Sequence, residues 1–264
     1  MKVLAGQLTP AGDPATDAAT IAAALEEYPG ADLAVFPELF VGGYETGDPG
    51  RVAIDAAGPE LAGLGRRCGE VGTALIAGFT ERAGDDRYAN SAACFDQDGR
   101  LAAVYRKTHL FGEAEEGAFA AGDELVTVEL AGTVAAPLIC FDVEFPEPAR
   151  RLARAGARLL VTIAANMAPY GPDHRLAAQA RALDNRLPHV YVNRLGAAAG
   201  NEFVGGTCLI GTDGQVIEDE AETEGLFQFS LPPDDGPPPA VDYLNQLRDD
   251  LVVSAHNVPS GGGS

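Results

Sequence analysis

Three ionisable side chains of different chemistry each stand at the end of an apolar, strand-like run. In chain order they are Glu38, Lys107 and Cys140. A thiol that ends a strand and opens a turn into a helix is placed to attack a substrate, but an unassisted thiol is only slightly ionised near neutral pH. A carboxylate can take its proton, and an ammonium group can stabilise the oxyanion of a tetrahedral intermediate. The three residues therefore predict acyl transfer from nitrogen.

The predicted course uses these side chains and water, without a metal or an organic cofactor. Glu38 accepts the proton of Cys140, passes it to the leaving nitrogen and later activates water. Lys107 stabilises the oxyanion together with the backbone N–H of Phe141. A thioester on Cys140 is the predicted intermediate. We also expect the ammonium group and the following helix N-terminus to lower the pKa of the thiol.

The use of lysine along the chain supports a special role for one position. The sequence has 18 Lys and Arg residues, of which only Lys2 and Lys107 are lysines. Arginine therefore meets nearly every other need for positive charge. A lysine directly after Arg106 indicates that a compact ammonium group, rather than a planar guanidinium, is required there.

Composition restricts the possible partners. The chain has 264 residues, 46% hydrophobic and 22% charged, with a net charge of −21. Such an acidic protein lacks the basic face that nucleic acid or an anionic membrane requires. We find no signal-peptide pattern or apolar run of membrane-spanning length, and expect a cytoplasmic protein. The cysteines are scattered without a C-x-x-C pair, so we expect neither zinc nor disulfides, and place Cys68, Cys94 and Cys208 in the core.

Strand-like and helical patterns alternate along the chain, which predicts an α/β fold. The strand-like runs are 2–8, 32–37, 73–80, 89–96, 100–106, 125–130, 133–140, 157–164, 189–195, 203–210, 215–219 and 225–231. The helical patterns are 15–28, 58–71, 146–156, 173–187 and 239–250. The sequences of residues 96–99 and 212–215 are typical of hairpin turns in which glycine supplies a positive φ.

Three sequence blocks, residues 37–38, 106–111 and 139–147, together resemble the signature blocks of the nitrilase superfamily, the carbon–nitrogen hydrolases. The resemblance implies a four-layer α-β-β-α sandwich whose subunits commonly pair, so we expect a homodimer or a higher homo-oligomer. It also implies a Glu-Lys-Cys triad, carried by Glu38, Lys107 and Cys140. The auxiliary glutamate of the family follows the lysine; spacing favours Glu115 over Glu113 or Glu116, and its role is to hold the lysine and position the substrate.

The resemblance extends over nearly the whole chain, and the composition of the remainder marks further segments. We predict a carbon–nitrogen hydrolase domain over residues 1–231 and a proline-rich linker over 232–239. Residues 240–258 form a C-terminal segment that docks on the body or on a partner subunit. Residues 259–264 form a flexible tail that resembles an engineered spacer.

The residues after the nucleophile favour an amide as substrate. True nitrilases usually have Trp-Glu there, whereas this chain has Phe141-Asp142 and no tryptophan. We therefore predict hydrolysis of a small amide to a carboxylic acid and ammonia or an amine. Candidate pocket residues, besides Phe141, are Tyr44, Glu144, Asn166 and Met167.

Other activities and another catalytic triad also remain compatible with the sequence. The same triad could hydrolyse a nitrile or transfer the acyl group to an amine, and an inactive scaffold on the same fold is a more remote alternative. A Cys-His-Asp triad is also conceivable, built from Cys140, Asp142 and either His109 or His174. Asp142, two residues from the nucleophile, is an awkward orienting carboxylate for such a triad.

Overall fold

The structure, a computed structural model, describes residues 1–84, 87–231, 243–248 and 250–252. The predicted linker 232–239 and tail 259–264 lie outside the described residues, as does part of the segment 240–258. The division of the chain into these segments stays a prediction.

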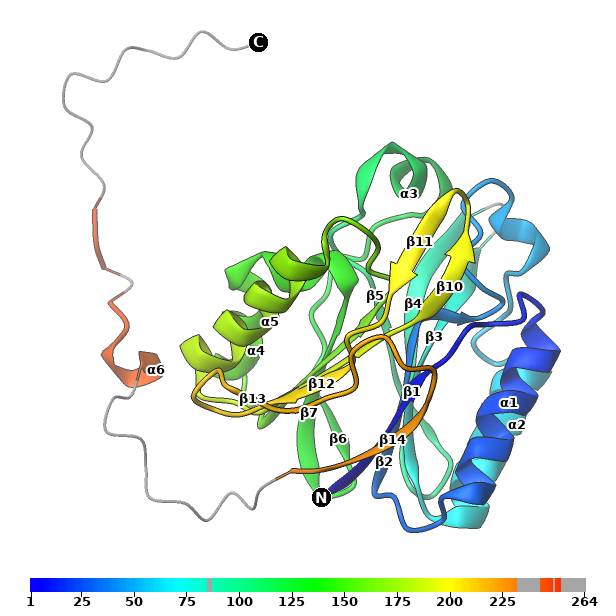
Figure 1. The fold of residues 1–264 in the computed structure, drawn as a ribbon, viewed down its shortest axis with the longest axis horizontal. Helices are drawn as coiled ribbons and strands as arrows, with labels where there is room; N and C mark the ends of the chain where they lie inside the picture. The colour runs from blue at the N-terminus through cyan, green and yellow to red at the C-terminus, as the bar shows by residue number, and fades with distance from the viewer. Residues whose placement is uncertain (85–86, 232–242, 249, 253–264) are drawn as a thin grey trace, which may run out of the picture.

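Two six-stranded sheets form the centre of the fold (Figure 1). The first has the order β14 (Gly225–Ser230), β1 (Lys2–Gln7), β2 (Leu33–Val41), β3 (Ala74–Gly84), β4 (Arg87–Phe95) and β5 (Leu101–Arg106). The second has the order β13 (Val216–Asp219), β12 (Cys208–Ile210), β9 (His189–Asn193), β8 (Leu159–Ala164), β7 (Thr133–Ile139) and β6 (Val128–Leu130). The central strands β1–β2–β3 and β7–β8–β9 are parallel, and the outer strands pair antiparallel.

Helices cover the outer face of each sheet. Helices α1 (Pro14–Glu27) and α2 (Pro59–Val71) lie side by side on the first sheet, where Ile21 and Leu61 join a buried cluster with Phe36 of β2 (Figure 1). Helices α4 (Pro146–Arg154) and α5 (Gly171–Asn185) lie on the second sheet, where Leu152 packs with Leu160 of β8. The predicted four-layer α-β-β-α sandwich is confirmed. The pairing of two such subunits stays a prediction.

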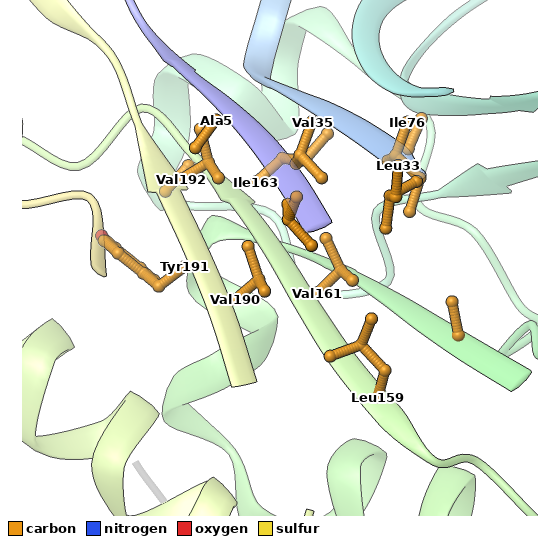
Figure 2. Packing of buried hydrophobic residues seen from close by; sticks show 14 of the residues in the cluster. Ala5, Leu33, Val35, Ile76, Leu159, Val161, Ile163, Val190, Tyr191 and Val192 are labelled. Atoms are coloured by element: carbon orange, nitrogen blue, oxygen red, sulfur yellow. The ribbon is translucent and has the colours of Figure 1, made fainter. Parts of the chain in front are cut away.

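The inner faces of the two sheets pack against each other. Figure 2 shows Val35 and Ile76 of the first sheet across from Val161, Ile163 and Val190 of the second. All six residues of β8 are buried, as expected for a strand covered on both faces. This double layer holds the carboxyl ends of β2, β5, β7 and β8 in fixed relative positions.

The remaining elements are short. They are the 3₁₀ turns η1 (Pro49–Arg51) and η2 (Cys140–Glu144), helix α3 (Gly112–Ala118), the hairpin β10 (Leu195–Ala198) and β11 (Asn201–Val204), and α6 (Tyr243–Gln246). None of the helices in the described part of the chain is long and apolar enough to cross a membrane.

Most predicted elements are present, and the exceptions have local causes. The predicted strand 203–210 is instead two strands, β11 and β12, because Gly205 and Gly206 between them adopt φ values of 64° and 81°. Within the predicted helix 239–250, the structure describes helix only in α6, where Tyr243 stacks under the guanidinium group of Arg186 at 4.7 Å. Helix α3 was not predicted.

Candidate active site

A bulge in β2 presents Glu38. The pairing of β2 with β3 is interrupted between Phe36 and Val41, and Leu39 has a φ of 49°. Pro37 lacks the N–H that a regular ladder would use at this point. Gly78 on β3 allows the bulge, because a Cβ atom there would lie 2.4 Å from the carbonyl oxygen of Pro37. The bulge thus depends on a proline in one strand and a glycine in its neighbour.

Lys107 follows β5 and lies between two carboxylates. Its Nζ donates to Glu38 Oε1 at 2.7 Å and to Glu115 Oε2 and Oε1 at 2.7 and 3.0 Å. All three side chains are buried, with at most 2% of each exposed. Burial alone would lower the pKa of Lys107, but the two carboxylates outweigh it and hold the pKa well above its usual value. The ammonium group therefore keeps its charge.

Further donors fix each carboxylate. Glu38 Oε1 also accepts from Asn90 Nδ2, and Glu38 Oε2 accepts from the backbone N–H of Ala165, both at 2.7 Å. Glu115 accepts from the Tyr44 hydroxyl at 2.8 Å and from the Phe111 N–H at 2.9 Å. Burial raises the pKa of Glu38, against the opposing effect of the lysine. A carboxylate with a raised pKa is better suited to exchange protons near neutral pH.

Cys140 begins η2 directly after β7, with a φ of 46° that is unusual for a side chain with a Cβ. The residue is 7% exposed. The Ala165 N–H that binds Glu38 also reaches the Cys140 sulfur, which brings the thiol and the carboxylate to one point. The bulge in β2, the residues directly after β5 and β7, and the start of the segment after β8 thus bring the predicted triad together around this backbone amide.

The predicted effect on the thiol pKa was wrong. Burial raises the pKa of Cys140 well above its usual value, and the carboxylates of Glu38 and Glu115 add to this effect, whereas Lys107 opposes it. The two carboxylates and one ammonium group leave a net negative charge beside the sulfur, so the protonated thiol is the resting form. The site therefore needs a base at the moment of attack, and Glu38 is in place.

A small pocket opens beside the nucleophile, with about 240 Å³ of empty space, part of it open to solvent. Its lining includes four residues predicted from sequence: Phe141, Glu144, Asn166 and Met167. Tyr44, also predicted to line it, lies instead behind Glu115 with its hydroxyl group bound to that carboxylate. The alternatives to Glu115, Glu113 and Glu116, are both exposed on α3.

Comparison with known proteins identifies the family. The model of the carbon–nitrogen hydrolase family matches residues 2–235. The chain belongs to the carbon–nitrogen hydrolases. The hydrolase is 38% identical over 195 residues to an (R)-stereoselective amidase of Pseudomonas sp., an alignment that covers 73% of this chain and 70% of the relative.

Solved structures agree with this assignment. The hydrolase superposes on an amidase from Nesterenkonia sp. with a TM-score of 0.83 and 28% identity, over 94% of this chain and 93% of that one. A mutant of that amidase, with the same TM-score and identity over 94% of both chains, carries the acetamide moiety of fluoroacetamide covalently on its active-site cysteine. The predicted membership of the nitrilase superfamily is confirmed.

Asp142 of the hydrolase has a structural role that the sequence did not reveal. Its carboxylate accepts from the Tyr105 hydroxyl at 2.7 Å, the Thr108 hydroxyl at 2.8 Å and the His109 N–H at 2.9 Å. It also accepts from the Ile139 N–H at 3.1 Å. Although burial raises the pKa of Asp142, these hydrogen bonds hold it below its usual value. Asp142 thus ties the nucleophile turn to the segment that carries the lysine.

Neither His109 nor His174 is arranged as the histidine of a Cys-His-Asp triad in the hydrolase. His109 Nδ1 lies 2.9 Å from Asp142 Oδ1, and this pair is part of the tie between the two segments. His174 does approach Cys140, with 3.8 Å between Nε2 and Sγ, but its Nδ1 contacts the Tyr191 hydroxyl at 2.9 Å rather than an aspartate. Neither His109 nor His174 therefore joins the thiol to Asp142.

Two further contributors were missed by sequence reasoning. Asn90, which binds Glu38, is a polar residue inside an apolar strand, and that contrast was a usable signal. Phe111, which lines the pocket, stands in a signature block but was assigned no role. In the described part of the chain, no group of three or more His, Cys, Asp or Glu side chains is arranged to hold a metal ion.

Proposed function

We propose that this hydrolase cleaves small amides to a carboxylic acid and ammonia or an amine through a thioester on Cys140. The observation that carries the proposal is the buried Lys107 ammonium group, bound by Glu38 and Glu115 beside the thiol. Burying three ionised groups costs free energy, and apolar residues of similar volume would stabilise a fold equally well. Such a cluster next to a nucleophile is consistent with chemistry rather than with stability.

In the first half-reaction, the Cys140 sulfur attacks the amide carbonyl carbon while its proton passes to Glu38. The carbonyl oxygen gains the negative charge, which the Lys107 ammonium group and the Phe141 N–H stabilise. Collapse of this intermediate breaks the C–N bond. Glu38 returns the proton to the departing nitrogen, which leaves as ammonia or an amine, and the acyl group stays on sulfur.

In the second half-reaction, water replaces the amine. Glu38, ionised again, accepts a proton from water as the water oxygen attacks the thioester carbonyl. The C–S bond breaks, the thiol recovers its proton from Glu38, and the acid is released. Lys107 keeps its charge throughout, because its pKa lies well above the usual range. Glu115 and Tyr44 hold the ammonium group in position.

The size of the pocket supports a small acyl group. The space beside Cys140 is about 240 Å³ even with the solvent at its mouth included, so it is narrow for a bulky acyl chain. The amidases of Pseudomonas sp. and Nesterenkonia sp. support amide chemistry, and the covalent acetamide adduct of the latter supports a cysteine nucleophile.

Mass spectrometry of the intact protein tests the proposal directly. During turnover of a panel of small amides, we expect an acyl adduct on the wild-type protein and none on Cys140→Ala. The variant should keep its fold by circular dichroism and lose turnover. Cys208→Ala is the matched control, because Cys208 is a buried thiol whose pKa burial raises to about 12. Amide hydrolysis by Cys140→Ala at the parent rate would exclude the mechanism. Adding an amine acceptor distinguishes hydrolysis from acyl transfer.

A further inference from the structure

The pocket beside Cys140 contains a carboxylate that the hydrolytic mechanism does not use. Glu144 ends η2, four residues after the nucleophile, and its side chain is 34% exposed. Nε2 of His174 lies 3.5 Å from Oε1 of this carboxylate. Whether Glu144 has a cationic partner in the free protein therefore depends on the charge of His174.

His174 is neutral. Burial lowers the pKa of His174 to about 3, and the positive charge of Lys107 acts in the same direction. Its contact with Glu144 is therefore not an ion pair at neutral pH. Burial raises the pKa of Glu144, and the negative charge of Asp173 adds to this effect, so the ionised carboxylate is disfavoured until a cationic ligand binds.

A chain of hydrogen bonds sets the direction in which His174 donates. Asn166 Oδ1 accepts from the Met167 N–H at 2.9 Å, which leaves the Asn166 amide group to donate to the Tyr191 hydroxyl oxygen. The Tyr191 O–H can then donate to His174 Nδ1, 2.9 Å away. This tautomer carries its proton on Nε2, which lies 3.5 Å from Glu144 Oε1 and 3.8 Å from Cys140 Sγ. A neutral His174 can thus direct an N–H toward the carboxylate without neutralising it.

Aromatic rings form much of the remaining wall. Phe111, Phe141 and Tyr170 line the same pocket, with ring centroids 5.3 Å apart for Phe111–Phe141 and 5.6 Å apart for Phe111–Tyr170. The faces of aromatic rings attract cations and repel anions. A carboxylate set among aromatic rings is complementary to an alkylammonium group. An acyl chain with its own carboxylate would meet repulsion, and a purely apolar chain would leave Glu144 without a partner.

We infer that the enzyme selects amides whose acyl chain carries a protonated amine, and that Glu144 pairs with this ammonium group while the aromatic rings enclose it. This inference rests on the proposed amide hydrolysis at Cys140. It adds a substrate class, small aminoacyl amides, and assigns Glu144 to specificity.

Pairs of substrates of equal size test the inference. Alaninamide and isobutyramide differ by an ammonium group in place of a methyl group, as do 3-aminopropanamide and butyramide. At about pH 6.5, α-amino groups with a pKa of about 7.7–8.0 are mostly protonated. We expect kcat/KM to favour the amine in at least one pair by about tenfold, or about 1.4 kcal/mol. Equal rates in both pairs, or a preference for the uncharged member of each, would overturn the inference.

Variants of Glu144 test whether this residue causes the preference for the amine substrate. In Glu144→Gln we expect the ratio of kcat/KM between the two members of the preferred pair to fall by about tenfold, mainly through KM, because an ion pair is lost. Glu144→Asp should recover part of the ratio. Glu147→Gln is the charge-matched control, since Glu147 is exposed on α4 and should leave the ratio unchanged. Thermal unfolding verifies that each variant is folded. An unchanged ratio in Glu144→Gln would exclude the role of Glu144.

The two proposals fail in different ways. If the wild-type protein hydrolyses none of these amides and forms no acyl adduct, the proposed function fails and the inference falls with it. If it hydrolyses isobutyramide or butyramide but discriminates against both amines, amide hydrolysis stands and the ammonium subsite is excluded.

Discussion

Arg106 and Lys107 are adjacent in the sequence, and each binds carboxylates in a different environment. Arg106 donates from Nε and Nη2 to Glu81, both at 2.7 Å, and 49% of its side chain is exposed. Lys107 has no exposed side-chain surface and donates to both Glu38 and Glu115. The guanidinium fork clamps one carboxylate at the rim of the sheet, a geometry suited to arginine. The buried ammonium group presents a compact charge beside a thiol.

The comparison distinguishes a cation that stabilises the fold from one that serves the proposed reaction. A half-exposed bidentate pair adds a modest amount of stability and can be replaced at modest cost. A fully buried ammonium group, paired twice, gains little net stability over apolar packing. Substitution of Arg106 should therefore affect activity far less than substitution of Lys107. The reciprocal substitutions Lys107→Arg and Arg106→Lys test this expectation.

Lys107→Arg should have the largest effect. The cavity around the ammonium group is closed, with contacts of 2.7–3.0 Å to two carboxylates, and a planar guanidinium cannot occupy it without displacing Glu38 or Glu115. We expect kcat/KM to fall by about a thousandfold, comparable to the loss of an oxyanion-hole donor.

Arg106→Lys is the matched control for this substitution. It changes the neighbouring cation in the opposite direction and should keep kcat/KM within a few-fold of the parent value. Steady-state kinetics on one amide and circular dichroism of both variants provide the measurement. Comparable losses in the two variants would remove the distinction between these residues.

The carboxylates of the two regions should also differ in their response to pH. Glu38 must be ionised to accept the thiol proton, and burial raises its pKa. Activity should therefore be lost, as pH falls, at a value above the ordinary glutamate pKa of about 4.3. The pH profile of kcat/KM measures this limb, with circular dichroism at each pH to verify folding. An acid limb at or below the ordinary glutamate value would show that Glu38 is not the base.

The contrast between these regions also shows what the sequence could reveal. Glu38, Lys107 and Cys140 were predictable because each ends a local apolar run inside a signature block. The packing of the two sheets then had to bring together the bulge in β2, the end of the edge strand β5 and the end of β7. The layered fold was predictable for the same reason, since β8 and its neighbours are apolar on both faces.

Other features depend on contacts that no local pattern encodes. Asp142 accepts hydrogen bonds from residues up to 37 positions away, so its tie to Tyr105 is invisible in either segment alone. Helix α3 has the sequence GEAEEGA, which lacks an apolar stripe, and a single buried residue, Glu115, faces inward. The direction in which the thiol pKa shifts depends on burial together with three neighbouring charges, and these are defined only once the site is assembled.

Glu81→Gln should have the smallest effect, on stability rather than on activity. Burial raises the pKa of Glu81, but hydrogen bonds from Arg106 and Ser91 outweigh it, so the pKa is lower in the folded state than in the unfolded state. The stabilisation is therefore complete above the unfolded value of about 4.3 and is lost as pH falls through the lower folded value. We expect the variant to lose about 1–2 kcal/mol at neutral pH, because the remaining amide forms weaker hydrogen bonds with Arg106.

Denaturant unfolding of Glu81→Gln and the parent at neutral and acidic pH measures this difference. The gap between them should narrow on acidification, because protonation of Glu81 removes the same interaction from the parent. A gap that stays constant with pH would mean that the cost comes from packing around Glu81, which is 5% exposed, rather than from its charge. In that case the Arg106–Glu81 pair would stabilise the fold through packing rather than through charge. Arg106 and Lys107 would then differ only in how deeply they are buried.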